Sequence, residues 1–349
     1  MATASARTFA AEQALPLALF EEITEVRVER PRWIEKEARR RKRPRRLTRD
    51  GKLVLLAIDH PARGVTAIRG DALAMGDRYQ YLARTRRVLD DPDLDGVVAT
   101  ADLLEELLIL SHLERKSTGA GFLDGRVLVG SMNRGGLAGT AFEMEDSFTG
   151  ITAKRLAELR CQGGKMMYRL DPQEPASGRT VLGCAEALVA LRRQGLAAFL
   201  EPLGVARGKG GYDPAKDAPT LVRQCGIAAG LGDSSAHLWL KLPYGEGFDR
   251  VTRATTLPIL LLGGPARESP AVTLMDFAAG LKAGSNVRGA IIGRNLLFPG
   301  AADPLPMCRA LTALVHGDAG LDGALQVLGE EGQAEATTPR RVAKRGRGK

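Results

Sequence analysis

The segment LVLLAIDHPARG, residues 53–64, is the most informative part of this 349-residue chain for its fold class. It begins with a short apolar run rich in branched side chains, which predicts a buried strand. The strand ends in Asp59 and is followed by His60, where an open doubly wound sheet would place a glycine-rich turn. The segment therefore favours an α/β fold other than a dinucleotide-binding sheet.

Seven more segments of this kind follow along the chain. The eight predicted strands are 53–59, 95–101, 126–132, 164–170, 196–202, 237–243, 257–264 and 289–294. Amphipathic segments such as 153–161, 184–194 and 221–231 lie between them and are long enough to cross to a parallel neighbour. Eight strand and helix units predict a closed (β/α)₈ TIM barrel over residues 51–330.

The two ends of the chain differ in charge from its body. Residues 27–49 hold twelve Arg and Lys against three Glu, and residues 340–349 add six more, so the rest is net acidic although the chain carries +9. Residues 1–50 are predicted to be a basic N-terminal extension with a helix over Phe9–Glu29 and an arginine-rich connection. Residues 331–349 are predicted to be a disordered basic tail.

The arginine run Arg39–Arg46 raises the alternative of a non-catalytic nucleic-acid-binding protein. No aromatic side chain interrupts the run, so base stacking has little support. A solvated basic segment is the favoured interpretation, and we expect no nucleic-acid partner.

The four cysteines and four histidines are scattered, without the spacing of a metal site or a disulfide framework. We therefore expect no metal and no cofactor. No segment approaches the roughly 20 apolar residues that span a bilayer, and the N-terminus lacks the basic start of a secretory signal. A cytoplasmic homo-oligomer with no membrane partner is expected.

Two lysines lie in apolar strands whose carboxyl ends would form the active site of such a barrel. Burial should lower the pKa of Lys241, in HLWLKLP, and free its amine to attack a carbonyl. The alternative is an edge lysine whose stem packs while its ammonium reaches water. Lys165, in GKMMYRL, is predicted to lower the pKa of Lys241, bind a substrate oxygen, form the imine itself or be structural.

Two carboxylates also close predicted strands. Glu201, in FLEP, is costly to bury unless a lysine on an adjacent strand pairs with it, and that pair would place a proton shuttle beside the imine. A purely structural ion pair is the alternative. The same reasoning applies to Asp59, for which the alternative is a cap of the helix that follows.

The last two strands end in glycines that predict a phosphate site. Gly263 and Gly264 close the seventh strand, and Gly293 and Arg294 close the eighth. Glycines let backbone N–H groups approach an anion, and an arginine binds it through two donors. The two halves together are more specific than either alone, because glycines after strands are common turns.

The ordered set of motifs resembles class I aldolases of the deoxyribose-phosphate, tagatose-bisphosphate and archaeal-type fructose-bisphosphate group, over roughly residues 50–300. The tagatose-bisphosphate branch is the most similar, through AIDHPARG, TAKRLAELRCQGGKMMYRLDP, FLEPL, LKLP and the GR after the eighth strand. The resemblance implies that Lys241 forms the imine, Glu201 shuttles protons, and Lys165 and Asp59 bind or polarise substrate hydroxyls. Arg294 would hold a phosphate.

The chain also departs from this pattern. His60-Pro61-Ala62 precedes Arg63, which we assign to substrate or phosphate binding, and the seventh strand ends GGP where a serine-containing turn is expected. Some members of the group that this chain resembles take part in inositol breakdown, so the resemblance implies 6-phospho-5-dehydro-2-deoxy-D-gluconate as the favoured substrate, cleaved to dihydroxyacetone phosphate and malonate semialdehyde. Fructose- or tagatose-1,6-bisphosphate is the alternative.

Overall fold

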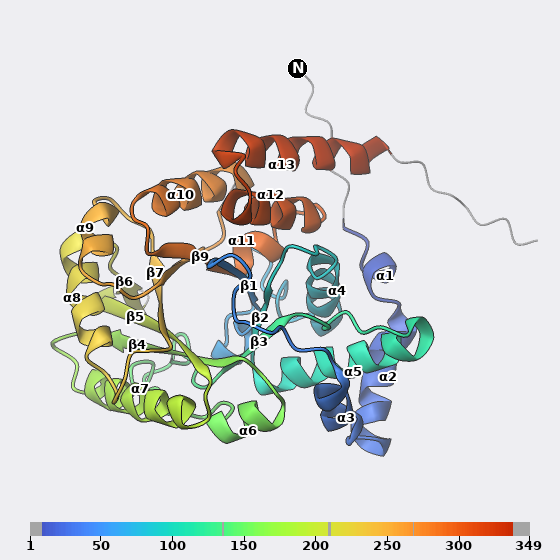
Figure 1. The fold of residues 1–349 in the computed structure, drawn as a ribbon, viewed down its shortest axis with the longest axis horizontal. Coiled ribbons are helices and arrows are strands. Elements are labelled where there is room, and N and C mark those ends of the chain that lie inside the picture. The colour runs from blue at the N-terminus through green and yellow to red at the C-terminus, as the bar shows by residue number, and fades with distance from the viewer. Residues whose placement is uncertain (1–8, 135, 209–210, 268, 338–349) are drawn as a thin grey trace, which may run out of the picture.

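Eight parallel strands close into a barrel in the computed structural model, which describes residues 9–134, 136–208, 211–267 and 269–337 (Figure 1). The barrel strands are β1 (Leu53–Ala57), β2 (Gly96–Ala99), β3 (Val127–Ser131), β4 (Gly163–Leu170), β5 (Ala197–Gly208), β7 (Leu238–Pro243), β8 (Ile259–Leu262) and β9 (Val287–Ile292). Each strand pairs with the next, and β9 pairs back with β1. The predicted (β/α)₈ barrel is confirmed, with all eight strands near their expected positions.

Helices follow the strands and cover the outside of the barrel (Figure 1). They are α4 (Arg78–Val88), α5 (Ala101–Thr118), α6 (Ala153–Glu158), α7 (Ala176–Arg193), α8 (Ala218–Ala229), α9 (Phe248–Arg253), α10 (Pro270–Lys282), α11 (Arg294–Leu297) and α12 (Leu305–His316). The side chains of Asp77, Thr152 and Asp217 accept a backbone N–H in the first turn of α4, α6 and α8. The three predicted crossover segments overlap α6, α7 and α8, and each extends one to three residues past the end of its helix.

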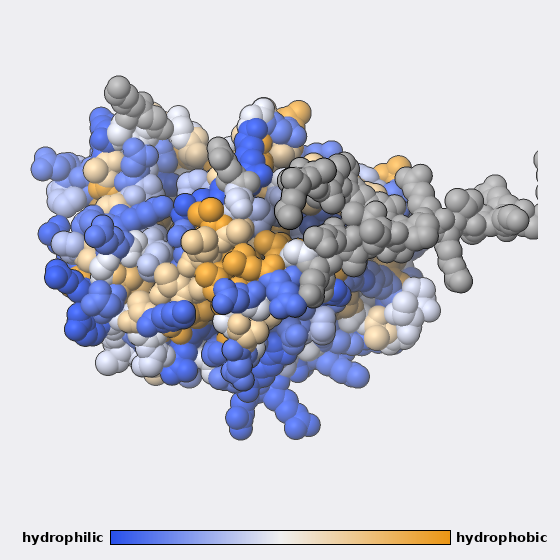
Figure 2. Space-filling model, turned by 90° about the horizontal axis from the view of Figure 1, so that it is seen from above, coloured by the Kyte–Doolittle hydropathy of each residue, from blue (hydrophilic) through white to orange (hydrophobic). Residues whose placement is uncertain are grey.

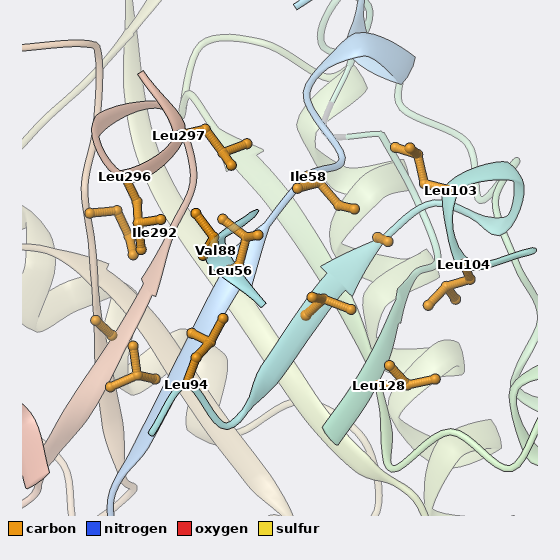
Figure 3. Packing of buried hydrophobic residues seen from close by; sticks show 14 of the residues in the cluster. Leu56, Ile58, Val88, Leu94, Leu103, Leu104, Leu128, Ile292, Leu296 and Leu297 are labelled. Carbon is orange, nitrogen blue, oxygen red and sulfur yellow. The ribbon is translucent and has the colours of Figure 1, made fainter. Parts of the chain in front are cut away.

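The alternation of side chains along each strand creates two apolar cores. The side chains on the outer face of the strands pack against the helices, and Figure 3 shows Leu56, Ile292 and Leu128 beside side chains of the surrounding helices. The other face fills the barrel interior with residues such as Leu55 and Phe199. On or just after β1, β3, β4, β5 and β7, the next inward position at the carboxyl end is polar, and these side chains form the candidate site.

The fifth strand is longer than predicted. β5 continues beyond Pro202 to Gly208, and the chain returns as the antiparallel strand β6 (Gly211–Pro214). The prediction ended the strand at Pro202 because proline cannot donate a ladder hydrogen bond. The strand continues because its far end pairs with β4 and with β6. The strands β5 and β6 thus form a hairpin beside the mouth of the barrel.

The N-terminal extension is more structured than predicted. The expected helix over Phe9–Glu29 is divided at Pro16 into α1 (Ala11–Ala14) and α2 (Leu17–Glu29), because proline interrupts helical hydrogen bonding. A further helix, α3 (Trp33–Arg40), begins within the basic segment. Arg41 is buried and donates to the backbone carbonyls of Arg126 and Arg160, whereas the other basic side chains of the run are exposed.

The C-terminal helix α13 (Gly320–Thr337) packs on α12 and α10 and passes residue 331, where the predicted tail begins. The rest of that tail lies outside the described residues. Figure 2, seen from above Figure 1, shows hydrophobic side chains gathered on this face of the molecule. The helix α10 exposes two large hydrophobic side chains, Val272 and Met275. The homo-oligomer expected from the sequence stays a prediction. Within the described ranges, every helix is too short or too polar to cross a membrane.

One buried carboxylate fastens the N-terminal extension to the barrel. Glu37 of α3 accepts from Arg115 Nη2 at 2.8 Å and from Ser111 Oγ at 2.9 Å, and both donors lie on α5. Glu37→Ala should lower the free energy of unfolding by about 1–3 kcal/mol, because it removes a buried acceptor from Arg115 and Ser111, although Arg115 keeps its ion pair with Asp124. Urea unfolding checks the value. The half-exposed Glu35, paired with Arg155, is the matched control, and Glu35→Ala should cost less than about 1 kcal/mol. Equal losses would contradict the expectation.

Candidate active site

The four predicted catalytic residues meet inside the barrel, directly above its apolar filling. Asp59 follows β1, while Lys165, Glu201 and Lys241 lie on β4, β5 and β7. All four are less than 9% exposed. The barrel closure brings them together, because β4 pairs with β5 and β5 pairs with β7.

One carboxylate oxygen of Glu201 is shared by both lysines. Lys241 Nζ donates to Glu201 Oε2 at 2.8 Å, and Lys165 Nζ lies 3.3 Å from the same oxygen. Lys165 Nζ also donates to Asp59 Oδ2 at 3.1 Å, and that oxygen accepts from Ser131 Oγ at 2.7 Å. These contacts rule out Lys241 as an edge lysine and Asp59 as a helix cap.

The two lysines have different proton affinities. Burial lowers the pKa of Lys241, and the charge of Lys165 lowers it further, so that the attraction of Glu201 is outweighed. Burial acts in the same direction on Lys165, but Asp59 and Glu201 together raise its pKa above the usual value. Lys165 therefore holds its proton, and Lys241 is the lysine that more readily becomes a neutral amine.

Both carboxylates stay ionised. Burial by itself would raise the pKa of Glu201, but Lys241 and then Lys165 outweigh it and lower the pKa to about 2. Burial is likewise the largest influence on Asp59, and the attraction of Lys165 reverses it, so its pKa is also lowered. Each carboxylate is therefore available as a hydrogen-bond acceptor at neutral pH.

His60 is part of this site, although the sequence marked it only as a departure from a motif. Its ring packs against Gly293, where an added Cβ would lie 2.4 Å from His60 Cε1. Burial, helped by the charges of Arg294 and Lys241, lowers the pKa of His60 to about 3 despite the opposing effect of Asp59. Its Nδ1 is buried and has no hydrogen-bond partner among the described residues. His60 is therefore a neutral polar group at the mouth.

The two halves of the predicted phosphate site are joined by Asn295, which the sequence reasoning missed. Its Nδ2 donates to the carbonyl oxygens of Gly263 and Pro265, at 2.7 and 2.9 Å. Gly264 has a φ of +67°, which glycine adopts without strain. The turn after β8 is thus held against the start of α11, at Gly293.

The predicted arginines line the same mouth. Arg63 belongs to the short 3₁₀ helix η1 (Pro61–Arg63), and Arg294 begins α11. Burial lowers the pKa of Arg294, and the charge of Arg63 is the next contribution. Arg294 Nε is buried and meets no acceptor in the part of the chain that the structure describes. Two guanidinium groups that are close together favour an anion between them.

Two further mouth residues were missed. Tyr81 of α4 is fully buried and its hydroxyl finds no partner within the described residues; nothing in its helical segment marked it. Arg169 of β4 forms a buried ion pair with Glu143. The period of two along GKMMYRL places Arg169 on the same side as Lys165, so the sequence did hold that signal. In the described ranges, no three His, Cys, Asp or Glu side chains cluster as metal ligands would.

One known protein family matches the part of the chain that contains all eight barrel strands. Residues 51–308 match the model of a family described as Cgl0159-like. The crystal structure of Cgl0159 from Corynebacterium glutamicum (Brevibacterium flavum) is 33% identical, covering 86% of this chain and 98% of that one, with a TM-score of 0.80.

More distant structures share the fold. A fructose-bisphosphate aldolase from Slackia heliotrinireducens is 16% identical with a TM-score of 0.60, covering 93% of this chain and 96% of that one. An archaeal fructose-1,6-bisphosphate aldolase, solved with its catalytic lysine covalently bound to a carbinolamine intermediate, is 18% identical with a TM-score of 0.54. That match covers 81% of this chain and 100% of the other.

Proposed function

This chain belongs to the Cgl0159-like family, and from that premise we propose that it is a class I aldolase whose Lys241 forms an imine with a phosphorylated ketose. The observation that carries the proposal is the oxygen of Glu201 shared by Lys241 and Lys165. A Schiff-base nucleophile needs a buried amine with a lowered pKa and a neighbouring group that accepts and returns protons. Lys241 and Glu201 supply both.

The reaction begins when the neutral amine of Lys241 attacks the ketose carbonyl. The carbinolamine loses water to give an iminium, which withdraws electrons from the adjacent carbon. Glu201, directly or through water, takes the proton of the hydroxyl next to the scissile bond. The C–C bonding electrons move into the iminium to give an enamine, and the aldehyde leaves. Protonation of the enamine and hydrolysis return the ketone product and free Lys241.

The other residues of the site bind and orient the substrate. Lys165, held as a cation by Asp59, donates to a substrate hydroxyl and keeps the pKa of Lys241 low. Arg294 and the backbone at Gly293 bind the phosphate, together with the turn at Gly263 and Gly264. This assignment places the phosphate at β8 and β9, across the mouth from β4.

The comparisons support the same chemistry. Two structures that share the fold are named as fructose-bisphosphate aldolases, one of them with its lysine bound to a carbinolamine. The proposed products are dihydroxyacetone phosphate and an aldehyde. The favoured substrate is 6-phospho-5-dehydro-2-deoxy-D-gluconate, and fructose- or tagatose-1,6-bisphosphate is the alternative.

Borohydride reduction with each candidate ketose phosphate tests the proposal. The substrate should leave a reduced adduct on the peptide that contains Lys241, because borohydride converts the iminium to a stable amine. Peptide mass mapping locates the adduct, and chelator should leave the activity unchanged. An adduct on Lys165 would overturn the residue assignment. An active enzyme with no adduct, or one that chelator inactivates, would refute the imine mechanism.

A further inference from the structure

We propose that His316, Asp50 and Asp95 form a pH-dependent latch, which fastens the C-terminal end of α12 to the segments leading into β1 and β2 and loses its Asp50 contact when the His316 ring is deprotonated. The latch lies at the amino ends of the barrel strands, whereas the candidate active site lies at their carboxyl ends. The inference therefore does not depend on the proposed function.

The geometry of the latch selects the charged form of the histidine. The side chain of His316 is 9% exposed, and its Nδ1 lies 2.8 Å from Asp50 Oδ2. Its Nε2 lies 3.0 Å from Asp95 Oδ2. A ring nitrogen donates to a carboxylate only when it carries a proton, and only the imidazolium carries a proton on both nitrogens. Both contacts can thus be hydrogen bonds only while His316 is a cation.

The surroundings of His316 also favour its charge. It is the last residue of α12, and the carbonyl end of a helix stabilises a cation. Burial alone would lower the pKa of His316, but its hydrogen bonds with Asp95 and Asp50 outweigh burial and raise that pKa above the usual value. The latch therefore holds its proton at a pH where an ordinary histidine loses it.

The other charged groups beside the latch have contacts of their own. Lys52 Nζ donates to the carbonyl of Val315 at 2.6 Å, and Arg49 Nε lies 3.9 Å from Asp95 Oδ1. Between pH 6 and 9, lysine, arginine and aspartate side chains generally keep their charge, whereas histidine does not. Two further charged residues lie close to these segments, Arg288 near Gly51 and the exposed Asp318.

The contact with Asp50 is the one that deprotonation breaks. A neutral imidazole has one N–H and one lone pair, and the lone pair repels a carboxylate oxygen. Asp95 is fixed, because its side chain is 10% exposed and its Oδ2 also accepts from Val54 N at 2.7 Å. The side chain of Asp50 is 35% exposed and can turn toward water. The neutral ring therefore keeps its proton on Nε2, toward Asp95.

The sign of the pH effect follows from these shifts. Because the pKa of His316 is raised, the stability that its charge contributes is complete below about pH 6.5 and is lost as the pH rises through the raised value. Burial alone would raise the pKa of Asp50, but hydrogen bonds with His316 and Lys52 N lower it. Its contribution is complete above about pH 3.9 and is lost only as the pH falls through the lowered value.

Thermal unfolding at pH 6 and pH 9 tests the latch. The wild type should have a higher Tm than His316→Asn, and this difference should be about 1–3 °C larger at pH 6 than at pH 9, because the asparagine side chain does not titrate. His237→Asn is the matched control, since His237 is exposed in the turn before β7, and it should not change the pH dependence. Equal pH dependence in the wild type and His316→Asn would overturn the latch.

Two further variants identify the contact that breaks. Asp50→Asn should lower the Tm at pH 6 and change it by less than about 1 °C at pH 9, where this contact is already lost. Asp95→Asn should lower the Tm at both values, because Asp95 binds His316 in both protonation states. An NMR titration needs no variant, and the His316 ring should titrate above pH 6.5. Titration at or below pH 6.5, or equal effects of Asp50→Asn at pH 6 and 9, would overturn the proposal.

Discussion

Replacing Lys241 with methionine should lower kcat for ketose cleavage by a factor on the order of 10⁴ or more, and should remove the borohydride adduct. No other described amine can take its place, because Lys165 is the one other lysine in this cluster and its two carboxylate partners raise its pKa. Steady-state kinetics and mass mapping of the reduced protein measure the two effects.

The loss should come without unfolding. Methionine retains most of the apolar volume of the lysine stem, and Glu201 keeps Lys165 as an ionic partner at 3.3 Å. The exposed Lys282 on α10 offers the control, and Lys282→Met should leave both kcat and the adduct unchanged. A Lys241→Met protein that still cleaves the ketose, or that gains an adduct on Lys165, would show that Lys241 is not the nucleophile.

The core of this site was predictable because it depends on regular structure. An apolar segment that contains one lysine, as in HLWLKLP, predicts both a strand and the burial of that lysine. The order of strands in a closed barrel then makes neighbours of the fifth and sixth predicted strands, and this favoured a contact between Glu201 and a lysine on an adjacent strand.

The contacts that could not be predicted join irregular segments far apart in the chain. Glu143 lies in the loop after β3, and its distance in sequence from Arg169 carries no periodic signal. Asn295 holds a turn that begins 32 residues earlier, at Gly263. Such loop contacts depend on the folded positions of several strand ends, which the local pattern of hydrophobic residues does not specify.

The N-terminal extension shows a different limit. Its charge composition predicted an arginine-rich connection, yet α3 places Ile34, Glu37 and Ala38 on one buried face. From the sequence, Glu37 is expected to be a surface residue in a charged segment. It is buried because Ser111 and Arg115 of α5 donate hydrogen bonds to its carboxylate. The charge composition of the segment predicted the exposed side of this helix correctly, but it gave no sign of the side that packs against the barrel.

Glu201→Gln should separate imine formation from bond cleavage. The amide cannot accept the hydroxyl proton, so kcat should fall about 10²- to 10⁴-fold. The same change removes the carboxylate that raises the pKa of Lys241, and that pKa should fall further below its usual value. Since the neutral amine is the nucleophile and forms above its pKa, the rise of trapping rate with pH should move to lower pH, and trapping at neutral pH should persist.

Two measurements across pH test this expectation: the rate of borohydride trapping, which reports imine formation, and the steady-state rate of cleavage. Glu145→Gln is the control, because Glu145 is an exposed carboxylate paired with Arg179 on the surface, and its removal should change neither profile. If Glu201 only positioned Lys241, its loss would lower trapping and cleavage by the same factor. A trapping profile that moves to higher pH would show that the carboxylate does not stabilise the protonated amine. Retained trapping with lost cleavage therefore identifies Glu201 as the base that acts after the imine has formed.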